Sequence, residues 1–297
     1  MIYAAVDIGS NATRLLFANV FEIDNEVFVE KASLIRIPTR LGEDVYTTNH
    51  ISDEKAEMLV KTLKAFRLLI EAYKPVEYDA CATAAMREAD NGSEILELVK
   101  KEAGFDVRMI DGIEEANIIR KTNKIGFHHP DKVAMYIDVG GGSTDISILE
   151  NNRIIGVKSF KIGTLRLLKK KVKKKEWQEL EKWLREFKPY FSKMNLVGSG
   201  GNINKINKIY GNATTFVLTY KKLLEGYNHL KGFSLDARID KLGLRPDRAD
   251  VIVPAAKIFI YIMEIVRAKS ILVPKIGLTD GLIYQLYVKQ KEKQNQG

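Results

Sequence analysis

Short apolar runs alternate with amphipathic segments along most of the chain, which predicts a mixture of strands and helices. Segments 38–51 and 124–132 show neither the alternating pattern of a strand nor the spacing of an amphipathic helix, so we expect them to be loops. Apolar, partly β-branched runs predict strands at 3–7, 15–20, 27–37, 76–83, 107–110, 133–137, 146–149, 153–160, 195–197 and 271–273. Helical spacing predicts helices at 52–73, at 93–104, around 114–115, through the lysine-rich stretch before 195, after 202, at 219–231, after 234, at 246–266 and at 281–297.

One arrangement occurs twice: an apolar strand that ends in Asp, a turn with Gly and hydroxyl side chains, and another apolar strand. The two aspartates, Asp7 and Asp138, are 131 positions apart (138 minus 7). A repeat of half the chain implies two similar α/β domains, whose turns we expect to face each other across a cleft. We place the domains at 1–124 and 125–280 and expect the last helix, about 281–297, to pack back on the first.

The central turn lies between Asp138 and Asp145. Its three glycines let backbone N–H groups approach a ligand without obstruction from Cβ atoms, and its hydroxyl side chains add donors. Carboxylates beside such a cradle repel an anion unless a cation lies between them, and oxygen ligands of this kind suit Mg²⁺. The turn therefore indicates a metal and phosphate site, although a glycine-rich hairpin with polar ends fits the same residues. The turn residues are Gly140, Gly141, Gly142, Ser143 and Thr144.

Two further turns have similar chemistry. Gly9, Ser10 and Asn11 form the first copy of the repeated turn. The run Gly198 to Asn202, which includes Gly200 and Gly201, follows a short strand and leads into a helix. A glycine turn before a helix amino terminus is a recurring anion site, and a simple tight turn is the alternative. A P-loop is excluded, because no Gly-Lys-Ser/Thr opens a helix.

Composition narrows the class of protein. The chain has 297 residues, 45% hydrophobic and 29% charged, with a net charge of +9 that favours acidic partners such as nucleotides or phosphate polymers. No nucleic-acid motif is present, so we expect no nucleic-acid partner. The amino terminus has no basic leader and the longest apolar stretch is interrupted by charges, so we expect no signal peptide and no membrane span. With Cys81 as the single cysteine, the expected location is the cytoplasm, and homodimer formation is left open.

In order along the chain, these motifs resemble the exopolyphosphatase and guanosine pentaphosphate phosphatase family, within the actin-like (ribonuclease H-like) ASKHA superfamily. The resemblance is carried by Asp7 to Asn11, Ala82 to Arg87, Gly112 to Ala116, Asp138 to Asp145, Gly198 to Asn202 and Arg248 to Asp250. It implies an actin-like fold for both domains and a phosphohydrolase that acts on inorganic polyphosphate or on the 5′ γ-phosphate of guanosine pentaphosphate with Mg²⁺. The family commonly has Glu where this chain has Asp145 and Thr where it has Asn202.

The resemblance also implies roles for individual residues. The general base lies in the Glu114 and Glu115 pair, and we favour Glu115, because it shares a helix face with apolar residues whereas Glu114 lies on the wetter side. A solvated helix carboxylate is the alternative for Glu115. Arg87 is expected to clamp phosphate, with a plain surface arginine as the alternative. Asp138 would hold Mg²⁺ and Asp145 would assist it, while Asp7 would orient metal-bound water or the Gly9 turn.

Two other functions remain open. A kinase or ATPase of the same superfamily would share the Asp-Gly turns, but no adenosine pocket signature accompanies them. A non-catalytic sensor of polyphosphate or guanosine pentaphosphate would need no base, so Glu115 argues against it. The run of six lysines within residues 169–175 is interpreted as a solvated segment, with a landing strip for polyphosphate as the functional alternative. His128 and His129 could indicate a metal site, but without spaced carboxylates or cysteines we expect a solvated hinge.

Overall fold

The chain forms two compact units. A computed structural model describes residues 1–297 apart from 25, 122–132, 152, 213 and 296–297. The first unit comprises Met1–His128 and Gly277–Gly297, and the second comprises His129–Ile276. The expected boundary after 124 and the histidine pair both fall in 122–132, outside the described residues. The first unit resumes at Gly277, earlier than the boundary expected after residue 280.

The first unit contains a five-stranded sheet in the order β3-β2-β1-β4-β5. Its strands are β1 (Ile2–Ile8), β2 (Thr13–Ile23), β3 (Glu26–Ile37), β4 (Tyr78–Ala82) and β5 (Arg108–Met109). The first three form an antiparallel meander, and β4 and β5 are added in parallel to β1. Residues of β1 are buried on both faces, which explains its nearly continuous apolar sequence.

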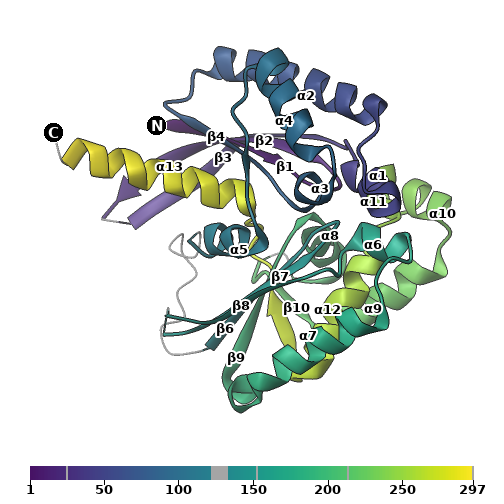
Figure 1. Cartoon of the computed structure of the whole chain (residues 1–297). Helices are drawn as coiled ribbons and strands as arrows, with labels where there is room; N and C mark the ends of the chain where they lie inside the picture. Colours follow the sequence, from purple (N-terminus) through teal and green to yellow (C-terminus); the bar gives the residue numbers. More distant parts are fainter. Residues whose placement is uncertain (25, 122–132, 152, 213, 296–297) are drawn as a thin grey trace. The chain divides into compact units, whose positions relative to one another are not determined.

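Helices cover both faces of this sheet. They are α1 (Leu41–Thr48), α2 (Asp53–Tyr73), α3 (Ala84–Glu88), α4 (Gly92–Ala103), α5 (Gly112–Lys121) and α13 (Leu278–Asn295). Helices α2 and α4 lie on one face, and α13 lies on the other with α5 beside it (Figure 1). The last helix of the chain is therefore part of the first unit.

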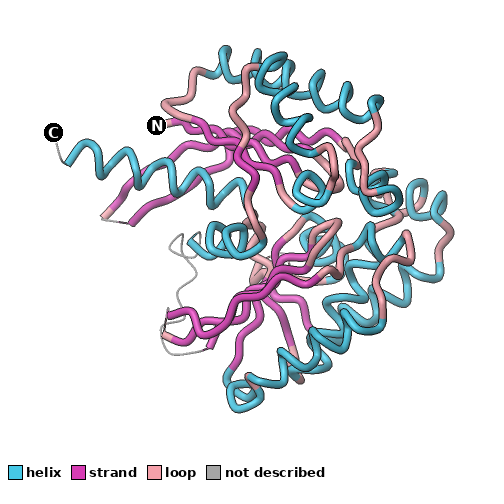
Figure 2. Tube along the Cα trace, in the orientation of Figure 1, coloured by secondary structure: helices cyan, strands magenta, loops and turns pink. Residues whose placement is uncertain are grey.

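The second unit contains a six-stranded sheet in the order β10-β11-β9-β6-β7-β8. Its strands are β6 (Val133–Val139), β7 (Thr144–Glu150), β8 (Arg153–Phe160), β9 (Met194–Ser199), β10 (Val217–Thr219) and β11 (Ser270–Leu272). Again three strands form an antiparallel meander, and β9 and β11 are added in parallel to its first strand. Apart from β10, this is the strand order of the first unit, so the predicted repeat is confirmed. Figure 2 shows the strands of both units in magenta and the helices in cyan.

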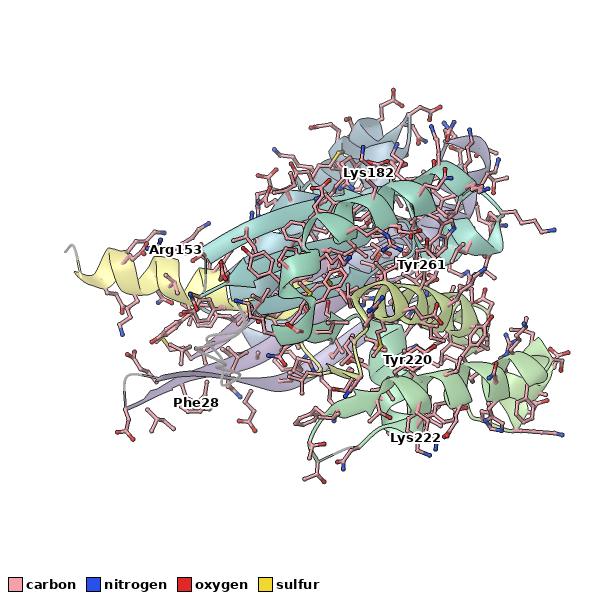
Figure 3. The ribbon with its side chains drawn as sticks, turned by 90° about the horizontal axis from the view of Figure 1, so that it is seen from below. Phe28, Arg153, Lys182, Tyr220, Lys222 and Tyr261 are labelled. Carbon is pink, nitrogen blue, oxygen red and sulfur yellow. The ribbon has the colours of Figure 1, made fainter. Side chains whose placement is uncertain are left out.

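The core of the second unit is built around α12 (Ile252–Val266), which is almost entirely apolar. The other helices are α6 (Thr164–Leu168), α7 (Lys174–Glu186), α8 (Gly201–Tyr210), α9 (Tyr220–Gly232), α10 (Leu235–Asp240) and α11 (Pro246–Ala249), with a 3₁₀ helix at Lys188–Lys193. At the edge of this core, the Tyr261 hydroxyl donates to Glu181 at 3.2 Å and its ring packs edge-on against Trp177. Tyr261 is labelled in Figure 3.

Two predicted segments were wrong, and one strand was missed. The expected loop 38–51 contains α1, and the expected single helix 246–266 is interrupted at Asp250 and Val251 between α11 and α12. Strand β10 was not predicted, because its three residues carry too short a pattern. Among the described residues, no helix is both long enough and apolar enough to cross a membrane.

Candidate phosphate and metal site

The central turn joins β6 to β7 as a tight hairpin. The N–H of Gly140 donates to the carbonyl of Ser143 at 3.0 Å, and Asp138 stands directly opposite Asp145 in the strand register. The two carboxylates therefore lie side by side at the base of the turn. This is the pairing that the sequence predicted for the metal and phosphate site.

The carbonyl groups of this turn are held from one side by the start of α6. Thr164 and Leu165 donate their N–H groups to Gly140 and Gly141 at 3.1 and 2.9 Å. The Arg166 Nε donates to the Gly142 carbonyl at 2.6 Å from a side chain that is almost fully buried. In a trans peptide group the N–H points away from the C=O. Because the carbonyl groups of the turn point toward α6, its N–H groups point away from that helix. Within the described residues, the N–H groups of Gly141 and Gly142 donate to no protein atom, as an anion cradle requires.

This close approach requires glycine at position 163. A Cβ atom there would lie 2.4 Å from the Gly141 carbonyl oxygen, far inside van der Waals contact. Gly163 and Arg166 were not among the site residues predicted from the sequence. Their position just after β8, with Arg166 three residues after the glycine, is the only signal that pointed to them.

The two aspartates of the turn are oriented by serines. Ser199 Oγ donates to Asp138 Oδ1 at 2.6 Å, and Ser143 Oγ donates to Asp145 Oδ2 at 2.8 Å. Asp145 is only 3% exposed. Two fixed carboxylates with hydroxyls beside them are a donor set that fits Mg²⁺, which binds through one or two carboxylates and completes its shell with water and phosphate oxygens. The described residues contain no cluster of three or more His, Cys, Asp or Glu side chains that could hold a metal.

The third glycine turn lies beside Asp138. Gly200 has φ +104°, and a Cβ atom there would lie 3.2 Å from Asp138 Oδ1. Both the backbone conformation and the lack of space therefore favour glycine at this position. Helix α8 begins at the next residue, Gly201, which is followed by Asn202. Burial lowers the pKa of Lys205, one turn into α8, and the positive charges of Lys208 and Arg248 lower it further. The predicted anion site therefore begins a helix whose first turns carry a concentration of positive charge.

The first copy of the turn has the same construction. Gly9 donates its N–H to the Ala12 carbonyl at 3.2 Å, as Gly140 does to Ser143. The carbonyls of Ser10 and Asn11 accept N–H groups from Gly42 and Arg40 at the start of α1, at 2.8 and 3.3 Å. Thus α1 holds the first turn as α6 holds the second.

Side-chain contacts also fix the first turn. Ser10 Oγ and the Tyr46 hydroxyl are 2.8 Å apart, and both side chains are buried. Asp7 is 3% exposed and forms an ion pair with Arg14 at 2.5 Å. The negative charge of Asp7 is therefore balanced by a neighbour on β2. Its predicted role in orienting metal-bound water stays a prediction.

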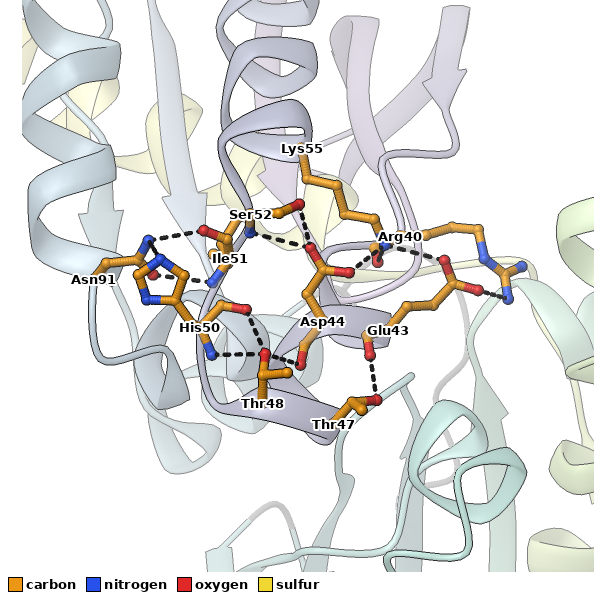
Figure 4. A network of polar contacts seen from close by, with 10 residues as sticks. All are labelled: Arg40, Glu43, Asp44, Thr47, Thr48, His50, Ile51, Ser52, Lys55 and Asn91. Carbon is orange, nitrogen blue, oxygen red and sulfur yellow. Dashed lines mark hydrogen bonds and ion pairs between the residues drawn. The ribbon is translucent and has the colours of Figure 1, made fainter.

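A polar network fixes α1 on α2 (Figure 4). The Lys55 ammonium donates to the Arg40 carbonyl at 2.7 Å and pairs with Glu43 and Asp44 at 3.0 and 3.1 Å. Asp44 also accepts the hydroxyl and the N–H of Ser52, at 2.6 and 3.1 Å. Helix α1 has no side-chain cap of its own, and Arg40 before it has φ 48°. The contacts from α2 therefore stabilise the start of α1 in place of a local cap.

The two candidate bases have different surroundings on α5. Glu114 forms an ion pair with Arg108 at 2.7 Å, and its side chain is 45% exposed. Glu115 is 8% exposed, on the face that also carries the buried Ile118 and Ile119. The predicted difference between the two faces of this helix is therefore confirmed, while the catalytic role of Glu115 stays a prediction.

Glu115 and Asp7 both act electrostatically on one buried residue of the first unit, Cys81. Cys81 is paired with Asp7 across β1 and β4. Burial raises the pKa of the Cys81 thiol, and the negative charges of Asp7 and Glu115 raise it further. Arg87, on α3, donates to the Ile110 carbonyl just before α5 at 2.6 Å. A guanidinium has five N–H donors, so this bond is compatible with the predicted phosphate contact.

Comparisons with known proteins agree with this fold. A model of the Ppx/GppA phosphatase family matches residues 20–290. Over 98% of both chains, the structure resembles the crystal structure of the Ppx/GppA family member of Aquifex aeolicus, with a TM-score of 0.75 and 26% identity. It also resembles an exopolyphosphatase from Cytophaga hutchinsonii, with a TM-score of 0.80, 22% identity and coverage of 96% of this chain and 97% of that one. The expected α/β fold with two similar actin-like domains is confirmed.

Two curated relatives are longer than this chain. A bifunctional 3-dehydroquinate synthase/phosphatase from Fusobacterium nucleatum is 28% identical over 298 residues, which cover 88% of this chain and 43% of the relative. A guanosine-5′-triphosphate,3′-diphosphate pyrophosphatase from Photobacterium profundum is 24% identical over 303 residues, which cover 98% of this chain and 60% of the relative. The chain therefore spans about half the length of the curated relatives that it matches.

Proposed function

The chain belongs to the Ppx/GppA phosphatase family, and we propose that it is a Mg²⁺-dependent phosphohydrolase that releases the terminal phosphate of inorganic polyphosphate, the 5′ γ-phosphate of guanosine pentaphosphate, or both. A relative named as a guanosine-5′-triphosphate,3′-diphosphate pyrophosphatase and a structural neighbour named as an exopolyphosphatase support these two substrates. The net charge of +9 also suits a polyanionic substrate.

The observation that carries the proposal is the turn between Asp138 and Asp145. Its carbonyls are bound by α6 and Arg166, and the N–H groups of Gly141 and Gly142 are therefore available to phosphate oxygens. The carboxylate pair beside them supports Mg²⁺ binding, in which Asp138 would be the main ligand and Asp145 the second. A bound Mg²⁺ would neutralise charge on the phosphate oxygens.

The residues of the chain have separate tasks in this reaction. Glu115 accepts a proton from the attacking water as the bond from its oxygen to phosphorus forms. The bond to the leaving phosphate breaks, and the electron pair stays on the leaving oxygen. Arg87 and backbone amides of the glycine turns balance the charge on the transferred group. The buried position of Glu115 supports its assignment as the base, because a carboxylate removed from bulk water is better placed to bind one ordered water.

Phosphate release tests this function. Release from polyphosphate, guanosine pentaphosphate and ATP is measured side by side, with Mg²⁺ and with a chelator. We expect release from at least one of the first two, dependence on Mg²⁺, and little release from ATP. Preference for ATP would favour the ATPase or kinase alternative, and tight binding of guanosine pentaphosphate without release would favour a sensor.

A further inference from the structure

Helix α13 approaches the backbone of α5 closely at Gly281. A Cβ atom on Gly281 would lie 2.3 Å from the Ile118 carbonyl oxygen and 2.6 Å from its Cγ2. Contacts this short do not occur for a real Cβ, and the oxygen belongs to the backbone, so no change of rotamer can relieve them. Glycine at position 281 therefore sets how closely the two helices pack.

Helix α5 is the element that carries Glu115. Glu115 and Ile118 are three residues apart, which places them one turn apart on the same side of the helix. The start of the helix is fixed separately: Asp111 accepts the Glu114 N–H at 2.7 Å, and Arg87 holds the preceding Ile110 carbonyl. With its first turn held at the sheet, the tilt of α5 depends on what supports it near Ile118.

Helix α13 is itself firmly seated. Asp280 is 4% exposed, accepts the Gly277 N–H at 2.9 Å and pairs with Lys31 of β3 at 2.9 Å. Behind Gly281, apolar residues of α13 share one buried cluster with α5 and the first sheet: Leu278, Leu282, Ile283, Leu286 and Tyr287 pack with Ile118, Ile119, Cys81 and Ile110. A collision at Gly281 would therefore be relieved mainly by movement of α5.

We propose that Gly281 is a positioning residue for the Glu115 carboxylate and that the last helix of the chain, through this glycine, sets the place of the general base. The proposal rests on the proposed function, in which Glu115 takes the proton from water. It assigns no substrate contact to Gly281. The phosphate turns do not depend on the contact, because Gly281 lies against α5 and not against either turn.

A methyl group at this position has a specific expected effect. Ile118 must retreat by about 1 Å for the contact to become tolerable, and misplacement of a catalytic group by about that distance can cost about 10²-fold in rate. We expect Gly281→Ala to lower kcat by about 10- to 100-fold and to change KM by less than about 3-fold. A general loss of folded protein would lower the number of active molecules without altering the pH profile, whereas a displaced base would alter it.

A matched control is available on α9. Gly226 is also a buried helical glycine, and its Cβ would lie 2.7 Å from the Tyr210 ring in the second unit. Gly226→Ala introduces the same methyl group at a buried helical position, here against a side-chain ring, and it leaves α5 untouched. We expect it to lower thermal stability while kcat per folded molecule stays within about 2-fold of the parent.

The decisive experiment combines Gly281→Ala with Glu115→Gln, and it also follows amide hydrogen exchange in residues 112–121. If Gly281 acts through Glu115, adding Gly281→Ala to Glu115→Gln should cost less than about 3-fold further in kcat, and Gly281→Ala alone should speed exchange in α5. Equal losses in both backgrounds, or unchanged kcat and exchange in Gly281→Ala, would overturn the inference. Full activity of Glu115→Gln would instead show that Glu115 is not the base. Hydrogen exchange in α5 would still decide whether Gly281 fixes that helix.

Discussion

Arg14 and Asp145 occupy equivalent positions in the two halves of the chain. Each is the residue that stands opposite the aspartate at the end of the first strand, Arg14 opposite Asp7 and Asp145 opposite Asp138. The same strand, turn and strand therefore contain an ion pair in the first unit and two carboxylates in the second. The first place therefore sets a guanidinium against a carboxylate, whereas the second sets two carboxylates opposite each other, the kind of oxygen ligands that suit Mg²⁺.

This difference predicts how the three aspartates respond to substitution. Asp138→Asn should abolish Mg²⁺-dependent turnover, because it removes the principal carboxylate ligand, and Asp145→Asn should do less. Activity is measured against Mg²⁺ concentration for each variant. Asp7→Asn is the comparison: since Arg14 already balances Asp7, it should shift the Mg²⁺ requirement less than Asp138→Asn does. Full activity of Asp138→Asn at ordinary Mg²⁺ would contradict the assignment.

The choice between the two glutamates is tested by paired amides. Glu115→Gln keeps shape but cannot accept the proton, so kcat should fall by about 10² to 10⁴, or about 3 to 5 kcal/mol of barrier, with little change in KM. Glu114→Gln loses only an exposed ion pair with Arg108 and should stay within about 3-fold of the parent. Steady-state kinetics of both variants decide the matter, and the reverse order of effects would assign the base to Glu114.

The lysine run at 169–175 offers a test of substrate length. Its six lysines are all exposed; they link α6 to α7, and Lys174 and Lys175 lie in the first turn of α7. Positive charge at a helix amino terminus is repelled by the positive end of the helix dipole. A polyanion bound there would be stabilised by the lysine charges and by the dipole. Replacing four of these lysines with Gln should reduce kcat/KM for long polyphosphate and flatten its dependence on salt.

Guanosine pentaphosphate is the internal control for the lysine run, because a short substrate does not need the outlying charges. Its kcat/KM should be nearly unchanged in the same variant. Equal loss on both substrates would indicate a general effect on folding or charge, and no loss on either would leave the run as a solvated surface segment.

The network around Lys55 predicts a loss of stability in acid. Burial would raise the pKa values of Glu43 and Asp44, but hydrogen bonds from Arg40 to Glu43, from Ser52 to Asp44 and from Lys55 to both lower them below their ordinary 4.5 and 3.8. A carboxyl pKa lowered by folding contributes stability above its ordinary value and loses it as pH falls through the lowered value. The free energy of unfolding should therefore fall below about pH 4.

Lys55→Met isolates this contribution because it keeps the length of the side chain. Denaturant unfolding at pH 7 should show a loss of about 1 to 3 kcal/mol, with a weaker pH dependence between about 3 and 5. Lys61→Met serves as control, since the Lys61 and Glu57 pair on the same helix is largely exposed and should contribute under about 0.5 kcal/mol. Equal losses in the two variants would show that the network adds nothing beyond a surface ion pair.

The sequence predicted well the helices and strands whose ends are determined by neighbouring residues in the chain. Helix α2 follows Ser52 and ends before Pro75, and strand β8 spans Arg153–Phe160 as expected. Helix α1 was missed because both of its ends have a left-handed residue, Arg40 and Asn49, and its stability comes from Lys55 on another helix. The break between α11 and α12, at Asp250 and Val251, was also missed.

The sequence by itself determined the three glycine turns, the paired strands around them and the carboxylates that end those strands, because tight turns and alternating burial depend on residues a few positions apart. Only the tertiary structure decided that Arg14 balances Asp7, that Arg166 and α6 bind the carbonyls of the central turn, and that Gly281 supports the helix of Glu115. These relationships depend on strand register and on helices brought together from distant parts of the chain. Neither leaves a periodic pattern in the sequence, since a contact between distant residues is fixed by how whole elements pack.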